Sequence, residues 1–156
     1  MKLNYALRLA TDADYAFLYD LHTKTMKAPV EKTWGWDEAF QKTYFREHFT
    51  TSNVYVIMID DQPAGKFSYR YEADGITIFL AEIEILPEFQ GKGLGTTLIR
   101  TLIDEASAKH STVRLQVLKA NPDARRLYER LGFKIYSETE PSFLMRWSDS
   151  PILANT

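Results

Sequence analysis

The sequence predicts an α/β fold, with a mixed, mostly antiparallel, twisted sheet of six to seven strands and about four helices on both faces. Two observations predict it. Along the 156 residues, apolar positions change repeatedly between the alternation of strands and the three- to four-residue spacing of helices. Three consecutive strands then precede a strand–helix–strand crossover, and that order is typical of a mixed sheet.

The first third of the chain predicts one strand and two helices. A short alternating segment ends near Leu9, and Thr11 follows as a helix cap. Helical spacing of apolar residues predicts a helix over about 12–26, and we expect Pro29 to end it. After a loop, Asp37 is the expected cap of a second helix.

The middle of the chain predicts three strands. An apolar run over 54–59 is typical of a buried strand, and a clean alternation follows over 66–72. The Asp74-Gly75 pair predicts a hairpin turn, after which a long strand is expected over 76–86.

The last third returns to helix and strand in turn. The expected elements are a helix from Gly93, a strand over 113–117, a helix capped by Asn121, and strands over 133–137 and 143–147. A chain of this length predicts one domain, which we place at residues 1–148, with a tail over 149–156.

Composition limits the function classes. Lys and Arg number 19 against 21 Asp and Glu, and this balance argues against binding to nucleic acid. Cysteine is absent, which excludes disulfides, thiolate metal sites and a Cys nucleophile and suits a reducing compartment. No apolar run approaches the roughly 20 residues that span a bilayer, and the N-terminus lacks a signal-peptide core. We therefore expect a cytoplasmic protein with no membrane partner.

A glycine-rich segment joins the 76–86 strand to the following helix. Its sequence is Gln90-Gly91-Lys92-Gly93-Leu94-Gly95. Closely spaced glycines allow backbone N–H groups to converge beside a helix N-terminus, an arrangement that binds diphosphate. The spacing fits neither the dinucleotide fingerprint nor the P-loop. A tight turn with no ligand is the alternative interpretation.

This segment resembles the acetyl-CoA-binding motif [RQ]-x-x-G-x-[GA] of the GCN5-related N-acetyltransferase (GNAT) family. A later run, Asn121 to Phe133, resembles that family's second motif, N-x-x-A-x-x-x-Y-x-x-x-G-F. Both motifs occur in the family's order, and the resemblance extends from Val54 to Trp147. The predicted fold is accordingly GNAT-like.

The resemblance implies acetyl-CoA as co-substrate, and nothing in the sequence indicates a metal. The residues that it assigns to acetyl-CoA are Ile83, Glu84 and Ile85 of the strand, Gln90, Gly91, Lys92, Gly93, Leu94, Gly95 and Thr96 of the loop, and Asn121 and Tyr128. Loop amides would hold the pyrophosphate, and the strand backbone would pair with pantetheine. Lys92 is equally a solvated loop residue, and capping alone accounts for Asn121.

Acyl transfer to an amine requires a base and a proton for the departing thiolate. Glu82 and Glu84 share one face of a strand, and we take Glu82 as first candidate for the base and Glu84 as second. One of them pairing with a cation of a neighbouring strand, such as Arg70, is the alternative. Tyr128 matches the family's tyrosine that protonates the sulfur, although it also fits an apolar helix stripe.

Aromatic residues gather near the first loop. In the family this region lines the acceptor pocket, so the candidate acceptor residues are Trp34, Trp36 and Asp37. Core packing of the tryptophans and helix capping by the acid are the alternatives. The three histidines, His22, His48 and His110, are expected at the surface.

The sequence thus predicts an enzyme that moves acetyl from acetyl-CoA to a primary amine by direct attack in a ternary complex. The alternative is a catalytically weak module that binds or senses acyl-CoA. The acceptor is a small-molecule or peptide amine whose identity the sequence leaves open, and a homodimer is common in the family.

Overall fold

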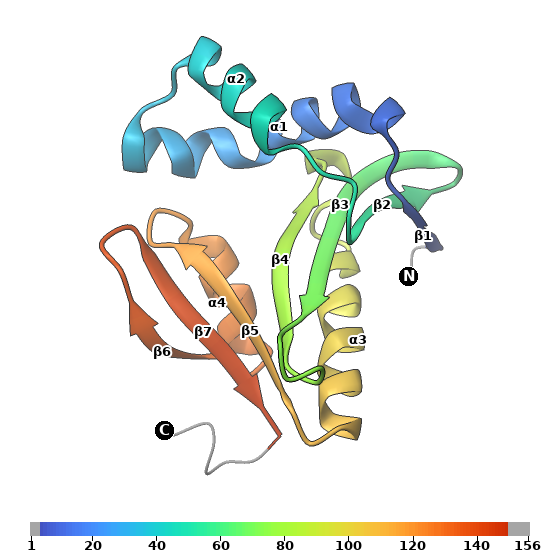
Figure 1. Ribbon diagram of the computed structural model, residues 1–156, viewed down its shortest axis with the longest axis vertical. Helices are drawn as coiled ribbons and strands as arrows, with labels where there is room; N and C mark the ends of the chain where they lie inside the picture. The colour runs from blue at the N-terminus through green and yellow to red at the C-terminus, as the bar shows by residue number, and fades with distance from the viewer. Residues whose placement is uncertain (1–3, 150–156) are drawn as a thin grey trace. The chain divides into compact units, whose positions relative to one another are not determined.

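The computed structural model describes residues 4–149, and its helices and strands follow the predicted order (Figure 1). The predicted tail lies outside these residues apart from Asp149. The strands are β1 (Tyr5–Leu9), β2 (Val54–Ile59), β3 (Gln62–Tyr71), β4 (Ile78–Ile85), β5 (Thr112–Leu118), β6 (Lys134–Glu138) and β7 (Ser142–Ser148). The α-helices are α1 (Tyr15–Trp34), α2 (Glu38–His48), α3 (Leu94–Ala108) and α4 (Pro122–Arg130), with short 3-10 turns at Asp12–Asp14 and Pro87–Phe89.

All seven strands belong to one sheet, in the order β1-β2-β3-β4-β5-β7-β6. The β4–β5 pair is parallel, whereas β1–β2, β2–β3, β5–β7 and β6–β7 are antiparallel. The structure therefore confirms the mixed, mostly antiparallel sheet. The parallel pairing covers only Ile78–Leu80 of β4, opposite Val113–Leu115.

The chain divides into two compact units, which we describe separately. The first contains the described residues up to Ser68 together with Glu82–Leu94, and the second contains Tyr69–Ala81 and the described residues from Gly95 onward. Strands β3 and β4 each contribute residues to both units.

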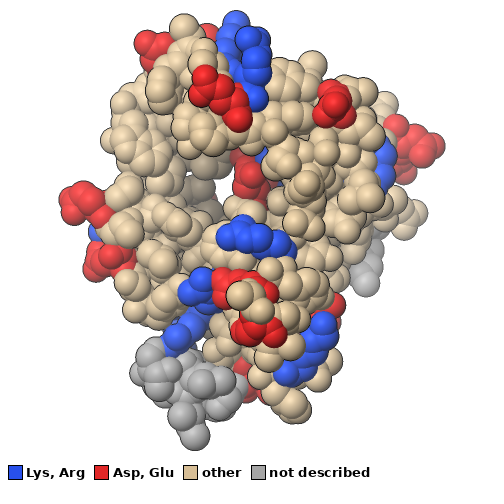
Figure 2. Space-filling view, viewed as in Figure 1, with Lys and Arg blue, Asp and Glu red and all other residues tan. Residues whose placement is uncertain are grey.

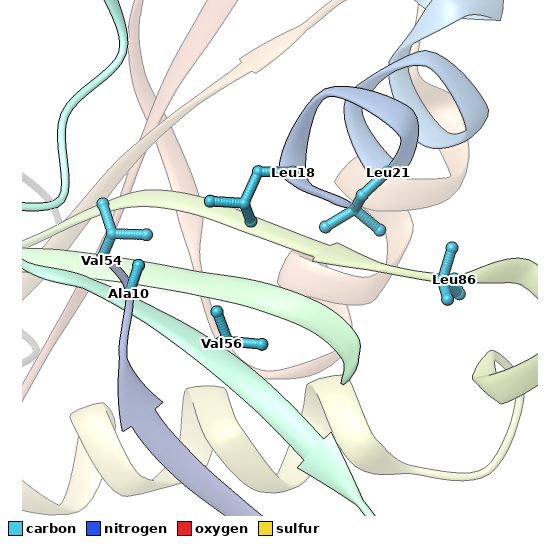
Figure 3. Packing of buried hydrophobic residues seen from close by; sticks show 6 residues of the cluster. All are labelled: Ala10, Leu18, Leu21, Val54, Val56 and Leu86. Carbon is cyan, nitrogen blue, oxygen red and sulfur yellow. The ribbon is translucent and has the colours of Figure 1, made fainter. Parts of the chain in front are cut away.

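The first unit has a core between α1 and the neighbouring strands. Figure 3 shows six of its side chains, which are Ala10, Leu18, Leu21, Val54, Val56 and Leu86. Five further apolar side chains pack around them, namely Phe17, Phe45, Phe49, Met58 and Phe89. Removing this apolar surface from water fixes α1 against the sheet, with burial of each large side chain worth about 1.5–3 kcal/mol.

Helix α1 is longer than predicted, because it continues through Pro29 to Trp34. Proline removes one backbone donor and clashes with the preceding turn, which makes it a reasonable predicted end. In the structure, Pro29 and Val30 are both buried. We attribute the continuation to this tertiary packing, which local sequence rules do not describe.

Helix α2 begins where the sequence predicts and lies along α1 (Figure 1). The Asp37 carboxylate accepts a hydrogen bond of 2.9 Å from the backbone N–H of Phe40, which confirms the predicted cap. The ring of Phe45 contacts Tyr15 and Tyr19 of α1 edge-on, with centroids 5.5 and 5.3 Å apart. These contacts place α2 beside α1.

The second unit is built from α3, α4 and the β5-β7-β6 strands. Leu98, Ile99 and Leu102 of α3 are buried, as is Val113 of β5. Asn121 caps α4 as predicted, with its side-chain oxygen accepting from the N–H of Ala124 at 3.3 Å. The start of α4 and the bounds of β5, β6 and β7 are therefore close to those that the sequence predicts.

Charged side chains of both signs occur on the face seen in Figure 2, without a large patch of one sign. Within residues 4–149, the structure contains no helix that is long and apolar enough to cross a membrane.

Candidate active site

The glycine loop leads directly into the N-terminus of α3. Gly91 and Gly93 have φ angles of +75° and +82°, a conformation that favours glycine. A Cβ atom added at either position meets no atom within 4 Å, so the space beside the loop is open. The N-terminus of α3, at Leu94, adds partial positive charge. These features fit a diphosphate group.

The loop is tied back to β4 through Gln90. The Gln90 side-chain amide donates a 2.7 Å hydrogen bond to the carbonyl of Ile85. The neighbouring carbonyl of Glu84 points toward Gly65 of β3, where an added Cβ would lie 2.4 Å from it. Backbone groups alternate in direction along a strand, so Ile83 and Ile85 direct theirs to the opposite edge, beyond the segment paired with β5.

Glu82 forms an ion pair with a residue of the neighbouring strand. Its Oε1 lies 2.9 Å from Nζ of Lys66, whose side chain is buried, while 44% of the Glu82 side chain is exposed. The alternative interpretation, in which one of the two carboxylates pairs with a cation of a neighbouring strand, is therefore correct for Glu82, although the partner is Lys66. The suggested Arg70 instead stacks on Phe79, 4.4 Å from the ring centroid.

Glu84 lies in a different environment from Glu82. Only 6% of it is exposed. Its Oε2 lies 3.7 Å from Nδ1 of His22, and its Oε1 has no hydrogen-bond partner among the described residues. A buried carboxylate oxygen without a partner is costly, and such groups concentrate at functional sites.

The prediction that His22 lies at the surface is wrong. Its side chain is 20% exposed, and its ring lies near those of Trp36 and Phe45, with centroid distances of 6.0 and 5.5 Å. One signal was available in the sequence: His22 follows the buried Leu18 by four residues and therefore shares its helix face.

Opposing effects act on the pKa of His22. Burial of the imidazole, the largest single influence, lowers its pKa, but the Glu84 carboxylate, Gln41 and Glu82 together raise it by more. The net pKa is above the ordinary value of 6.5. Gln41 is itself buried on α2, so side chains of α2, α1 and β4 meet at this point.

The three candidate acceptor residues have different roles. Trp34 is 66% exposed, so it is not a core anchor. Trp36 donates a 2.8 Å hydrogen bond from Nε1 to Glu38, which also accepts one from Tyr19 at 3.1 Å. The Asp37 carboxylate is used as the α2 cap. Trp36 is thus the candidate that contacts His22.

Tyr128 lies in the second unit, on α4. It is buried, and its ring centroid lies 5.9 Å from that of Phe133. Burial raises the pKa of Tyr128 to about 12, so its hydroxyl keeps its proton at neutral pH. Tyr128 is therefore a buried residue whose hydroxyl is protonated at neutral pH. In the described part of the chain, no cluster of three His, Asp or Glu side chains is suited to a metal ion.

Comparison with known proteins decides the family. The sequence model described as "Acetyltransferase (GNAT) family" matches residues 15–133. The chain belongs to this family. N-acetylaspartate synthetase of Danio rerio is 31% identical over 104 residues, which make up 66% of this chain and 37% of that protein. The [ribosomal protein bS18]-alanine N-acetyltransferase of Salmonella typhimurium is 34% identical over 94 residues, 60% of this chain and 62% of its own length.

This GNAT chain therefore matches about 37–62% of the length of these two relatives. Its fold is similar to the crystal structure of PaiA N-acetyltransferase from Thermoplasma acidophilum in complex with coenzyme A. The TM-score is 0.75 at 17% identity, over 94% of this chain and 99% of that one. The family's members are acyltransferases, and the likeness confirms the GNAT fold.

Proposed function

We propose that this GNAT chain transfers an acetyl group from acetyl-CoA to a primary amine, by direct attack within a ternary complex. The observation that carries the proposal is the family match over 15–133, which includes an open glycine loop and a buried, incompletely paired carboxylate. The chain contains no cysteine, so a cysteine-bound acyl intermediate is excluded and direct attack is favoured.

Acetyl-CoA binding is assigned to the loop and the end of β4. Backbone N–H groups of 90–96 would hold the diphosphate, and the exposed Lys92 adds a positive charge nearby. Ile83 and Ile85 would pair with pantetheine through backbone groups beyond the β4 segment paired with β5, although the Ile85 carbonyl already accepts from Gln90. Asn121, already the α4 cap, keeps its proposed contact with the co-substrate.

When bound, acetyl-CoA supplies a thioester that a neutral amine attacks. We assign removal of the amine proton to Glu84 rather than to Glu82, the first candidate from the sequence. Glu82 is 44% exposed and already paired with Lys66, whereas Glu84 is buried with one oxygen unengaged. Tyr128, whose hydroxyl stays protonated, is the proposed donor to the departing thiolate.

The acceptor is proposed to lie near α1 and α2, where Trp36 contacts His22, with Trp34 and Asp37 at its margin. The names of the relatives motivate small-molecule and N-terminal amines as candidates. We propose a cytoplasmic location from the absence of cysteine, and a homodimer from family resemblance alone.

The experiment is to incubate the protein with acetyl-CoA and a panel of amines and to measure free CoA thiol. The panel contains aspartate, a peptide with N-terminal alanine, a polyamine and lysine. We expect thiol release that depends on one class of amine. Tight acetyl-CoA binding with no release for any amine would instead support the acyl-CoA-binding module.

A further inference from the structure

The buried carboxylate of Glu84 has a partner at only one of its two oxygens within the described residues. Glu84 is 6% exposed, its Oε2 faces His22, and its Oε1 has no partner among residues 4–149. Buried carboxylates in folded proteins are normally paired and hydrogen-bonded through both oxygens. Glu84 therefore has capacity for one more cationic or hydrogen-bonding group.

The contact with His22 suits an exchangeable partner. At 3.7 Å the two groups attract through charge rather than through a short hydrogen bond. The imidazole also interacts with Gln41, and the rings of Trp36 and Phe45 lie beside it. One fifth of the side chain still reaches solvent, so His22 has a route for releasing its proton to water.

The other charged groups nearby are already engaged. Lys66 of β3 is paired with Glu82 of β4 at 2.9 Å. On the α2 side, Gln41 is neutral and Glu38 accepts hydrogen bonds from Tyr19 and Trp36. Lys27 lies over the Trp36 ring at 5.9 Å. Protonated His22 is therefore the counter-charge that Glu84 has among these neighbours.

We propose that the ammonium group of the acceptor binds Glu84 in exchange for the proton of His22, so that His22 is a positioning residue of the acceptor site. The inference rests on the proposed function, and it assigns the acceptor to cationic primary amines. Before binding, imidazolium and carboxylate form one neutral pair. After binding, ammonium and carboxylate form that pair, His22 is neutral, and its proton has passed to solvent.

This exchange gives His22 two effects on the reaction. Below its pKa, His22 competes with the acceptor for Glu84, so acceptor binding strengthens as pH rises through that pKa. The ring also orients the carboxylate, because it interacts with both Gln41 and Glu84. A histidine that only packed in the core would neither make acceptor binding depend on pH nor orient the carboxylate.

The test is an NMR titration of the histidine ring signals between about pH 5 and 9. The chain has three histidines, so His48 and His110 serve as internal controls. We expect the pKa of His22 to fall in Glu84→Gln, because the carboxylate charge is removed, while the two controls keep theirs. An unchanged His22 pKa in folded Glu84→Gln overturns the pairing.

The second arm adds n-butylamine as the ammonium probe, with tetramethylammonium as a cation that has no N–H. We expect butylammonium alone to lower the His22 pKa in a saturable way in the wild type, and to have no effect in Glu84→Gln. The exchange is overturned if the two cations shift the His22 pKa equally, or if butylammonium shifts it equally in the wild type and in Glu84→Gln. It is also overturned if neither cation shifts the His22 pKa.

Kinetics provide a third arm. In the wild type, KM for the best acceptor should fall as pH rises through the His22 pKa, and His22→Asn should lose this limb of the profile. His48→Gln is the matched control, expected to retain it. The NMR arms need no acetyl-CoA, so a chain that shows the exchange but releases no CoA keeps the inference and loses the proposed function.

Discussion

Lys66 Nζ lies 2.9 Å from Oε1 of Glu82, and this ion pair makes Glu82 different from Glu84, the other carboxylate of β4. Glu82 is solvated and neutralised, whereas Glu84, two residues later on the same face, is buried beside His22. Strand alternation alone treats the two residues as equivalent. The neighbouring side chains make them different.

The first prediction compares these two carboxylates. Glu84→Gln should reduce acetyl transfer at neutral pH by about 10²–10⁴-fold, as is typical for loss of a general base. Raising the pH should partly restore the rate, because the amine then loses its proton without help. Glu82→Gln is the matched variant and should lose much less. The reverse order of the two rates, measured by CoA release, would assign the base to Glu82.

The second prediction concerns the glycine loop. Gly93→Val should weaken CoA binding in calorimetry, because a branched side chain occupies the open space beside the loop and is strained at a φ of +82°. Gly75→Val is the control. It has a φ of +76° and the same open surroundings but lies in the hairpin turn after β3. Equal loss of CoA affinity in both variants would exclude a local effect of the loop.

The third prediction concerns Tyr128. Phenylalanine at this position keeps the ring and its packing but removes the hydroxyl proton, so Tyr128→Phe should lose about 10²–10⁴-fold in turnover while retaining CoA binding. Tyr136→Phe removes a hydroxyl that bonds Arg114 instead, and turnover should survive there. Wild-type turnover in Tyr128→Phe would leave the residue as core packing only.

The fourth prediction concerns stability in acid. Arg8 donates two hydrogen bonds of 2.8 and 2.7 Å to Asp14, and the backbone N–H of Thr11 donates a third of 2.8 Å. The Arg8 hydrogen bonds are the largest influence on the pKa of Asp14; burial opposes them, but the net pKa is below 3.8. A lowered carboxyl pKa stabilises the fold above the unfolded value of about 3.9 and is lost as pH falls through the folded value.

Asp14→Asn should therefore lower Tm at neutral pH, by an amount equivalent to about 1–3 kcal/mol. The difference from wild type should begin to shrink in melts below pH ~4, where Asp14 of the unfolded chain is protonated, and should disappear below the lowered folded pKa. Asp12→Asn makes the same change of charge in the same turn and should have little effect. A difference that persists undiminished in acid would show that shape, not charge, is responsible.

Local sequence rules predicted the parts of this molecule that depend on neighbours in the chain. The caps at Asp37 and Asn121 were predictable because the side chain bonds a backbone N–H three residues later. The glycine loop was predictable because positive φ selects glycine. The family motifs lie in these same local segments.

Pairings between distant segments were not predictable in the same way. Lys66 and Glu82 are sixteen positions apart, and His22 meets Glu84 and Gln41 from three separate elements. The spacing of His22 from Leu18 indicated an inward direction but not a partner. The requirement for glycine at position 65 was not predictable either, because it comes from the Glu84 carbonyl of β4, which lies 2.4 Å from where a Cβ would be. Strand order and helix docking decide such contacts.

Pro29 divides α1 into two parts that should differ in their local stability against opening. Because proline has no N–H, the carbonyl one turn earlier receives no bond from it, and the two segments of the helix are joined by one bond fewer. The final turn, 30–34, and the Gly35–Asp37 connection should therefore open together at a lower free energy than the turns around Leu18 and Leu21. Native-state hydrogen exchange should show this boundary as a step in protection between the two parts of a single helix.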